Sequence, residues 1–197
     1  MSTFTFEHET HTFRNSKGQV VPSVTQVLKR AGLIAEQFYE RADPNAKTLG
    51  ENVHWATSLV DKGRAGLVMS KAGRNRNTHS IKPYVRCWTE WKQRTGFTPV
   101  YVEHEFVSRY GYAGIVDRFG FFPDKSFAVV DLKTGHTIPP WVRYQLVGYV
   151  PEFGGVLAIR RFAVRLRSTG PAVTKEYEPD TAATDWAQFM KYVKEYR

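Results

Sequence analysis

Residues 111–149 read GYAGIVDRFGFFPDKSFAVVDLKTGHTIPPWVRYQLVGY. Its apolar runs at residues 112–121 and 127–133 predict two neighbouring strands. Residues 122–125 lie between the runs, and their Pro-Asp pair is typical of a tight turn. The two strands are therefore predicted to pair as a hairpin.

The hairpin carries polar residues that core packing does not explain. Asp117 lies in the first strand, and the second strand ends in Asp131-Leu132-Lys133. Because side chains alternate along a strand, Asp131 and Lys133 are expected on one face. The alternative reading is a solvated ion pair at the end of a strand, which contributes at most ~1 kcal/mol. Glu90-Trp91-Lys92 repeats the acid-x-Lys pattern in a predicted helix, so the triplet alone is weak evidence.

Carboxylates and an amine at one point suggest phosphodiester hydrolysis. Mg²⁺ is usually held by one or two carboxylates together with water and substrate phosphate, and Asp117 and Asp131 could supply them. Such a cation would activate a bound water, which Lys133 could orient. A strand is predicted at residues 99–108, with Tyr101, Glu103 and Glu105 on one face and Val102 and Phe106 on the other. Glu103 or Glu105 could complete the acidic cluster, and their spacing does not separate them.

Four motifs in order resemble those of the PD-(D/E)xK nuclease superfamily. The similarity covers about residues 48–170 and is greatest to the RecB-type branch, which includes phage-type exonucleases and the mitochondrial genome maintenance exonuclease. The motifs are Gly50-Glu51-Asn52-Val53-His54, Gly114-Ile115-Val116-Asp117, Asp131-Leu132-Lys133-Thr134 and the Gln-x-x-x-Tyr pattern of residues 145–149. The acid before the lysine is Asp131 rather than the commoner glutamate, which shortens its reach.

The resemblance implies an α/β fold with a restriction-endonuclease-like core, in which a mixed central β-sheet is flanked by helices and preceded by an N-terminal helical accessory region. It also implies a Mg²⁺- or Mn²⁺-dependent deoxyribonuclease. The implied metal site consists of His54, Glu103, Asp117, Asp131 and Leu132. The implied catalytic set is Asp117, Asp131, Lys133, Gln145 and Tyr149, with the lysine serving the attacking water.

Some of these residues have a purely structural alternative. His54 lies beside the apolar stripe of a helix predicted from Thr48, where a histidine can serve packing alone. Gln145 and Tyr149 are four apart on one helix face and could belong to an ordinary amphipathic helix. If His54 does bind the metal, imidazole beside carboxylates makes Mn²⁺ as plausible as Mg²⁺.

The charge of the chain favours a polyanionic partner. Lysine and arginine number 28 against 19 acids, a formal net charge of +9, and residues 61–95 contain nine bases against two acids. The alternative is a solvated basic surface. The predicted DNA-binding residues are Arg74, Arg76, Lys82, Arg86, Trp141, Arg143 and Tyr144.

The length of 197 residues and the 42% hydrophobic content predict one domain, with residues 1–47 as an accessory hairpin and helix and residues 48–197 as the nuclease core. Further helices are predicted at residues 23–32 and 80–96, from Pro139 and from Asp180, and strands at 161–167 and 173–177. The single cysteine, Cys87, allows no disulfide within the chain.

The sequence has no apolar run of membrane-spanning length and no signal-peptide pattern, so a soluble protein of the cytoplasm of a bacterial or phage-infected cell is expected. The resemblance favours an exonuclease of phage or bacterial DNA recombination or repair, acting on DNA ends or single-stranded regions, with a possible recombination partner protein. The alternatives are a structure-specific DNA endonuclease and a non-catalytic nucleic-acid-binding protein. The oligomeric state is not predicted.

Overall fold

The computed structural model describes residues 4–34, 44–69, 78–155 and 158–196. Its strands are β1 (Thr5–Glu7), β2 (Thr12–Arg14), β3 (Val20–Val21), β4 (Thr98–Val107), β5 (Ala113–Phe121), β6 (Phe127–Lys133), β7 (Arg160–Arg165) and β8 (Val173–Tyr177). Its α-helices are α1 (Val24–Arg30), α3 (Pro44–Asp61), α5 (Thr78–Thr95), α6 (Val142–Tyr149) and α7 (Ala182–Tyr196). Three short 3₁₀ helices are η1 (Ala65–Met69), η2 (Val150–Glu152) and η3 (Pro179–Thr181).

A five-stranded mixed sheet in the order β4-β5-β6-β7-β8 forms the centre of the molecule. β5 and β6 are the predicted antiparallel hairpin, and β6 pairs in parallel with β7 after the connection through α6. The outer pairs β4-β5 and β7-β8 are antiparallel. The predicted mixed α/β sheet is thereby confirmed.

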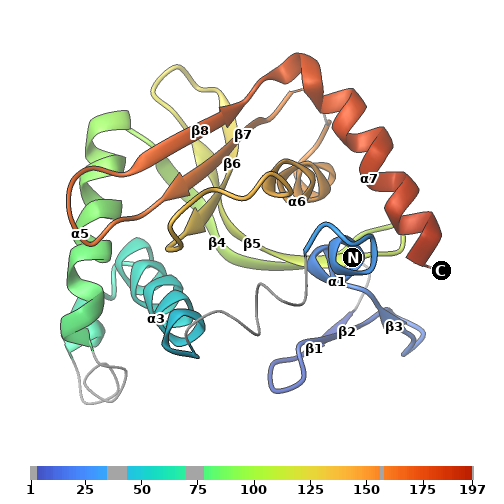
Figure 1. Ribbon diagram of the computed structural model, residues 1–197, viewed down its shortest axis with the longest axis horizontal. Helices are drawn as coiled ribbons and strands as arrows, with labels where there is room; N and C mark the ends of the chain where they lie inside the picture. Colours follow the sequence, from blue (N-terminus) through green and yellow to red (C-terminus); the bar gives the residue numbers. More distant parts are fainter. Residues whose placement is uncertain (1–3, 35–43, 70–77, 156–157, 197) are drawn as a thin grey trace.

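Helices cover both faces of this sheet (Figure 1). α3 and α5 pack on one face, and α1, α6 and α7 pack on the other. β6 serves both layers, because Ala128, Val130 and Leu132 join the core beneath α3 and α5 while Val129 joins the core beneath α6. A strand buried on both faces explains why the sequence of β6 is apolar until its last three residues.

Several helices begin at other residues than predicted: α5 begins at Thr78 rather than residue 80, and α7 begins at Ala182 rather than Asp180. The larger differences are at α3 and α6. α3 begins at Pro44 rather than Thr48, so it has an extra first turn. α6 begins at Val142 rather than Pro139, because the Val142 amide donates to the Pro139 carbonyl and residues 139–141 form a separate turn. The predicted start of α1 is confirmed by a capping box, in which Ser23 and Gln26 exchange side-chain to backbone hydrogen bonds.

The N-terminal region contains more sheet than predicted. Instead of a simple hairpin, β1, β2 and β3 form a three-stranded antiparallel sheet. Phe13 and Val21 pack this small sheet against Ala113 at the start of β5. Among the helices in the described ranges, none has the length and apolar character needed to cross a membrane.

Candidate active site

The site lies where β5 and β6 separate. Their ladder pairs run from Phe121↔Phe127 to Arg118↔Val130, and the next residues along the two strands are Asp117 and Asp131. There the Asp117 Oδ2 accepts a hydrogen bond of 2.7 Å from the Leu132 amide. A carboxylate thus takes the place of a backbone partner, which fixes its position between the two strands.

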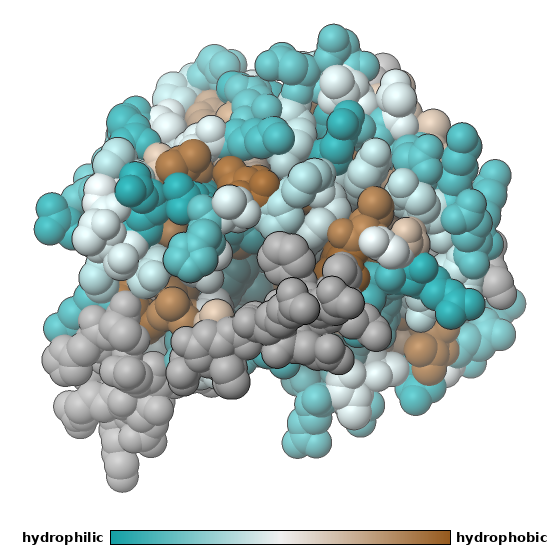
Figure 2. All heavy atoms as spheres, viewed as in Figure 1, coloured by the Kyte–Doolittle hydropathy of each residue, from teal (hydrophilic) through white to brown (hydrophobic). Residues whose placement is uncertain are grey.

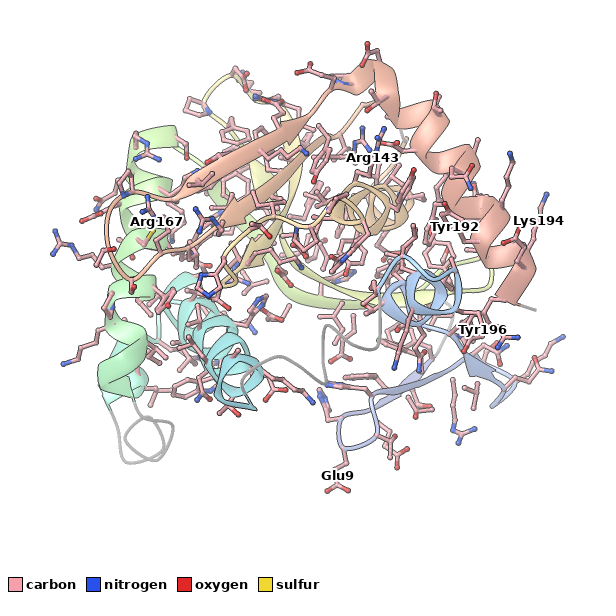
Figure 3. All side chains as sticks on the ribbon, viewed as in Figure 1. Glu9, Arg143, Arg167, Tyr192, Lys194 and Tyr196 are labelled. Carbon is pink, nitrogen blue, oxygen red and sulfur yellow. The ribbon has the colours of Figure 1, made fainter. Side chains whose placement is uncertain are left out.

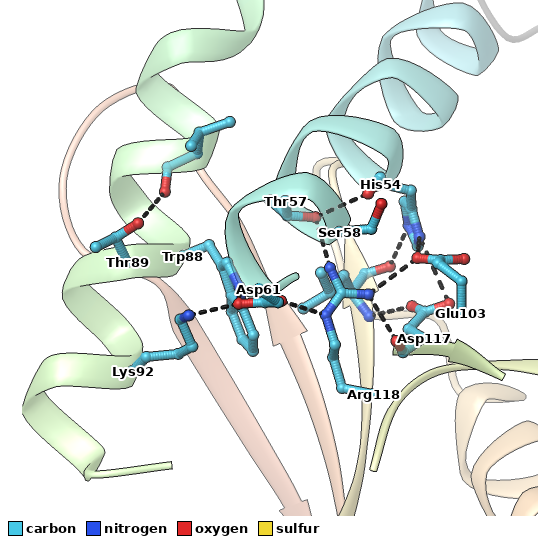
Figure 4. Close-up of polar contacts among 12 residues, drawn as sticks. His54, Thr57, Ser58, Asp61, Trp88, Thr89, Lys92, Glu103, Asp117 and Arg118 are labelled. Atoms are coloured by element: carbon cyan, nitrogen blue, oxygen red, sulfur yellow. Dashed lines mark hydrogen bonds and ion pairs between the residues drawn. The ribbon is translucent and has the colours of Figure 1, made fainter. Parts of the chain in front are cut away.

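Three potential metal ligands meet at this point from three elements. His54 comes from α3, Glu103 from β4 and Asp117 from β5, and one ligand atom of each lies within 4.8 Å of the others. The His54 Nδ1 is 3.5 Å from Asp117 Oδ1 and 3.7 Å from Glu103 Oε1 (Figure 4). The His54 Nε2 is 3.2 Å from the Leu132 carbonyl oxygen, so the main chain of Leu132 also borders the site.

The structure separates the two rival glutamates. Glu103 reaches His54, whereas Glu105 lies 3.6 Å from the exposed ring of His8. Glu103 has a φ of 53°, which interrupts the regular alternation of β4. The prediction that Tyr101, Glu103 and Glu105 share one face, with Phe106 on the other, is therefore wrong: Tyr101 contacts the core residue Phe119, and Phe106 belongs to that same core layer.

A second polar group lies on the α6 side of β6. Asp131 and Lys133 share a face, as predicted, with 2.7 Å between Asp131 Oδ2 and Lys133 Nζ. Lys133 also donates to Gln145 Oε1 at 3.1 Å, and Gln145 donates to the Tyr149 hydroxyl at 2.7 Å. The Lys133 ammonium lies 5.2 Å from the centre of the Trp141 ring. These contacts join the third and fourth motifs, and the hydrogen bond from the Leu132 amide to Asp117 joins the second motif to the third.

Burial and neighbouring charge shift the pKa values of the central groups. Burial alone would lower the pKa of His54, but the carboxylates of Asp117 and Glu103 outweigh it and raise this pKa to about 10. Burial would raise the pKa of Asp117, but the positive charges of His54 and Lys133, and the Leu132 amide, lower it to about 2. Burial raises the pKa of Asp131 to about 6, because the opposing attraction of Lys133 is offset in part by the charge of Asp117.

The donor set suits a hard divalent cation. Two carboxylates and one imidazole match the preference of Mg²⁺ for oxygen and of Mn²⁺ for oxygen with nitrogen. Asp131 is not one of the three clustered groups, since Lys133 holds its Oδ2 on the α6 side. The structure therefore brings together His54, Glu103 and Asp117 of the predicted metal ligands, with the Leu132 carbonyl beside them.

A buried arginine behind the site was not among the predicted residues. Arg118 follows Asp117, and its guanidinium donates to Glu103 Oε1 at 2.9 Å, to Thr57 Oγ1 at 2.9 Å and to Asp61 Oδ2 at 2.5 Å (Figure 4). A sequence signal was present, because Thr57 and Asp61 follow His54 by three and seven residues on one face of α3.

The predicted DNA-binding residues are distributed over several places. Arg74 and Arg76 lie outside the described residues. Lys82 and Arg86 are exposed on α5 and line a surface hollow of about 820 Å³ together with Arg167, which follows β7. The face of the molecule in Figure 2 is largely hydrophilic, with hydrophobic side chains only in small patches. Glu90 also lines the hollow and pairs with Arg86, so the lining has three basic residues and one acidic residue. This excess of positive charge favours an anionic partner.

The remaining three predicted DNA-binding residues are in or next to α6. Arg143 forms an ion pair with the buried Asp185 of α7, and Figure 3 shows it well apart from Arg167. Tyr144 packs edge to face on Tyr192, with 5.7 Å between ring centres. Trp141 packs against the core and beneath Lys133. Arg143 and Tyr144 thus have structural partners, and Trp141 is the one that touches the candidate site.

Among the comparisons with known proteins, the match to a family model agrees with these motifs. No curated protein matches the chain. Sixteen chains of solved structures match it. One of them, titled "Crystal structure of SSO0001", is 13% identical to this chain with a TM-score of 0.35, and the match covers 88% of this chain and 86% of that chain. A family model described as the PD-(D/E)XK nuclease superfamily matches residues 32–150, which is more than half of the chain. With the mixed sheet and the clustered acidic site in place, the chain belongs to the PD-(D/E)XK nuclease superfamily.

Proposed function

We propose that the protein is a Mg²⁺- or Mn²⁺-dependent deoxyribonuclease that hydrolyses phosphodiester bonds. The single observation that carries this proposal is the juxtaposition, where β5 and β6 separate, of the His54-Glu103-Asp117 cluster and the Asp131-Lys133 pair. One group supplies metal ligands, and the other supplies an ammonium beside a carboxylate. The first group can hold a cation that activates water, and the second can orient that water and stabilise developing charge.

Each side chain has a distinct task in this proposal. His54, Glu103 and Asp117 would hold the cation, and Asp131 would complete its coordination from the α6 side. When bound, the divalent cation polarises the phosphate and lowers the pKa of a water ligand. Lys133 would orient that water and stabilise negative charge that develops on the phosphate. The low pKa of Asp117 keeps its carboxylate ionised at any physiological pH.

Gln145 and Tyr149 would act by positioning Lys133. Gln145 is buried, and its carbonyl oxygen and amide nitrogen connect the ammonium to the Tyr149 hydroxyl. Burial, with the charges of Asp131 and Asp117, raises the pKa of Tyr149 well above its usual value, so the phenol remains protonated. A neutral amide and a neutral phenol hold the lysine in place without competing with the phosphate for its charge.

Within this function we favour an exonuclease of the RecB-type branch, acting on DNA ends or single-stranded regions during phage or bacterial recombination or repair. The support is the order of the four motifs and the basic hollow of Lys82, Arg86 and Arg167, which would contact the phosphate backbone. A recombination partner protein and a cytoplasmic location belong to the same proposal.

The test compares degradation of end-labelled linear DNA with that of circular single-stranded and duplex DNA, with Mn²⁺, Mg²⁺ or EDTA. A metal-dependent exonuclease degrades only the linear forms, and Asp117→Asn abolishes this while Asp124→Asn, in the exposed turn before β6, does not. Cleavage of circles would indicate a structure-specific endonuclease instead. Absence of metal-dependent cleavage on every substrate would leave a non-catalytic nucleic-acid-binding protein.

A further inference from the structure

We propose that Arg118 is the positioning residue of the metal centre, which holds Glu103 in place as a ligand while Asp61 holds Arg118. This inference rests on the proposed metal-dependent function and adds a residue pair to it. It predicts that the affinity for the metal depends on a guanidinium that does not itself touch the cation.

The first support is the complete burial of the arginine. Arg118 has no exposed surface, so its charge must be satisfied by protein groups. Its three nitrogens reach Asp61, Glu103 and Thr57, and Nη1 also donates to the main-chain oxygen of Asp117. One side chain therefore connects α3, β4 and β5, which are the three elements that supply the clustered ligands.

The second support is the anchoring of Asp61. The side chain of Asp61 is fully buried. Its Oδ1 and Oδ2 atoms accept hydrogen bonds from Trp88 Nε1 at 3.1 and 3.0 Å, and the carboxylate forms an ion pair with Lys92; both partners are on α5. Two basic residues, Arg118 and Lys92, thus face two acidic residues, Asp61 and Glu103. Because these α5 residues hold the Asp61 carboxylate in place, that carboxylate can in turn hold the Arg118 guanidinium in place.

The third support is the backbone of Glu103 itself. A φ of 53° is unfavourable for a residue with a side chain, and surrounding contacts must hold it. The hydrogen bond from Arg118 Nη1 fixes the same Oε1 atom that lies 3.7 Å from His54 Nδ1. Without the guanidinium, the partly exposed carboxylate is free to swing into solvent, and the cluster loses an oxygen ligand.

The experiment measures Mn²⁺ affinity by calorimetry, with no DNA and no turnover. Arg118→Met should weaken Mn²⁺ binding 10- to 100-fold, the usual effect of losing a partner that orients a ligand. Arg161→Met is the matched control: it removes another buried arginine, which pairs with Asp185 and contacts neither Glu103 nor Asp61, and Mn²⁺ affinity should remain within about 2-fold. A loss in Arg161→Met as large as in Arg118→Met would show that the loss of any buried guanidinium weakens metal binding through the fold, and would overturn the proposal.

A double-mutant cycle supplies the decisive readout. If Arg118 acts through Glu103, adding Arg118→Met to Glu103→Gln should change Mn²⁺ affinity by less than about 2-fold. A full second loss in the double variant would overturn the proposal. If Arg118→Met does not fold, Arg118→Lys keeps the charge without the fork that reaches all three partners, and the same cycle applies to it. Wild-type protein that binds no Mn²⁺ would refute the metal-dependent function itself, which is a different result from unchanged binding in the variants.

Discussion

Metal binding should displace a proton from His54. Asp117 and Glu103 raise the pKa of His54 to about 10, so in the metal-free protein the ring is a cation throughout the neutral range. Both ring nitrogens of a cationic imidazole carry protons, and such a ring cannot ligate a metal. The metal ion and the proton on His54 therefore compete, because the same two carboxylates stabilise either positive charge.

The size of this competition follows from the pKa. At pH 7.5 the ring lies about 2.5 pH units below its pKa, so deprotonation costs roughly 3 kcal/mol, which is a factor of about 300 in apparent affinity. Asp117, with a pKa of about 2, is already ionised and contributes no proton. Binding should thus release about one proton per metal, and apparent affinity should rise about tenfold per pH unit between pH 7 and 9.

Calorimetric titration of Mn²⁺ in two buffers of different ionisation enthalpy counts the released protons directly. Wild type should release about one at pH 7.5, and His54→Gln should release none and bind more weakly. His8→Gln is the matched control, because His8 also lies beside a glutamate, Glu105, but is far more exposed than His54. This variant should release the same number of protons as the wild type. Tight binding without proton release in the wild type would refute the assignment of His54 as a protonated ligand.

Three further predictions test other parts of the site. Lys133→Ala should abolish cleavage while leaving Mn²⁺ affinity within about threefold, since the lysine serves the water and not the metal; loss of metal binding as well would contradict that division. Gly114→Ala should lower the free energy of unfolding, measured in urea titrations, by about 1–3 kcal/mol, because the new Cβ would lie 2.8 Å from the Phe106 ring and 3.0 Å from the Tyr149 ring. Gly66 has open space around it, so Gly66→Ala should leave the free energy of unfolding unchanged. Arg167→Gln should weaken binding of single-stranded DNA and reduce the magnitude of its salt slope by about 0.7, while Lys191→Gln on α7 should leave the slope unchanged.

The hairpin and the helices were predictable because each rests on local patterns, whereas the mixed sheet was implied by the resemblance to a known family. Apolar periodicity located β5, β6, α5 and α7, and Ser23 and Gly32 marked the ends of α1. The start of α6 was less predictable, since a Pro-Pro pair suits a first helical turn and a preceding turn equally well. The third strand of the N-terminal sheet has two residues, too few to leave a periodic signal.

The candidate site was predictable where a motif carried it and unpredictable where tertiary contact did. His54, Asp117, Asp131 and Lys133 followed from four motifs in order. Arg118 has no distinctive sequence pattern of its own, and its role depends on Asp61, which is fifty-seven residues away in the chain. The helical spacing of His54, Thr57 and Asp61 indicates a polar face of α3. It does not identify Arg118 as the partner of that face, because an ion pair between distant elements leaves no periodicity.

The choice between Glu103 and Glu105 shows why a strand rule fails at a functional site. In β5, Val116 and Phe119 both pack in the layer of α6, although alternation would put them on opposite faces. A similar shift occurs in β4 at Glu103, the position across from Asp117 in the register. These two interruptions direct the carboxylates of Glu103 and Asp117 toward His54 on α3. With regular alternation from Tyr101 in β4 and from Phe119 in β5, both carboxylates would have faced α6. The break in the regular sheet is therefore what creates the cluster, and a prediction built on regular alternation misses it for the same reason.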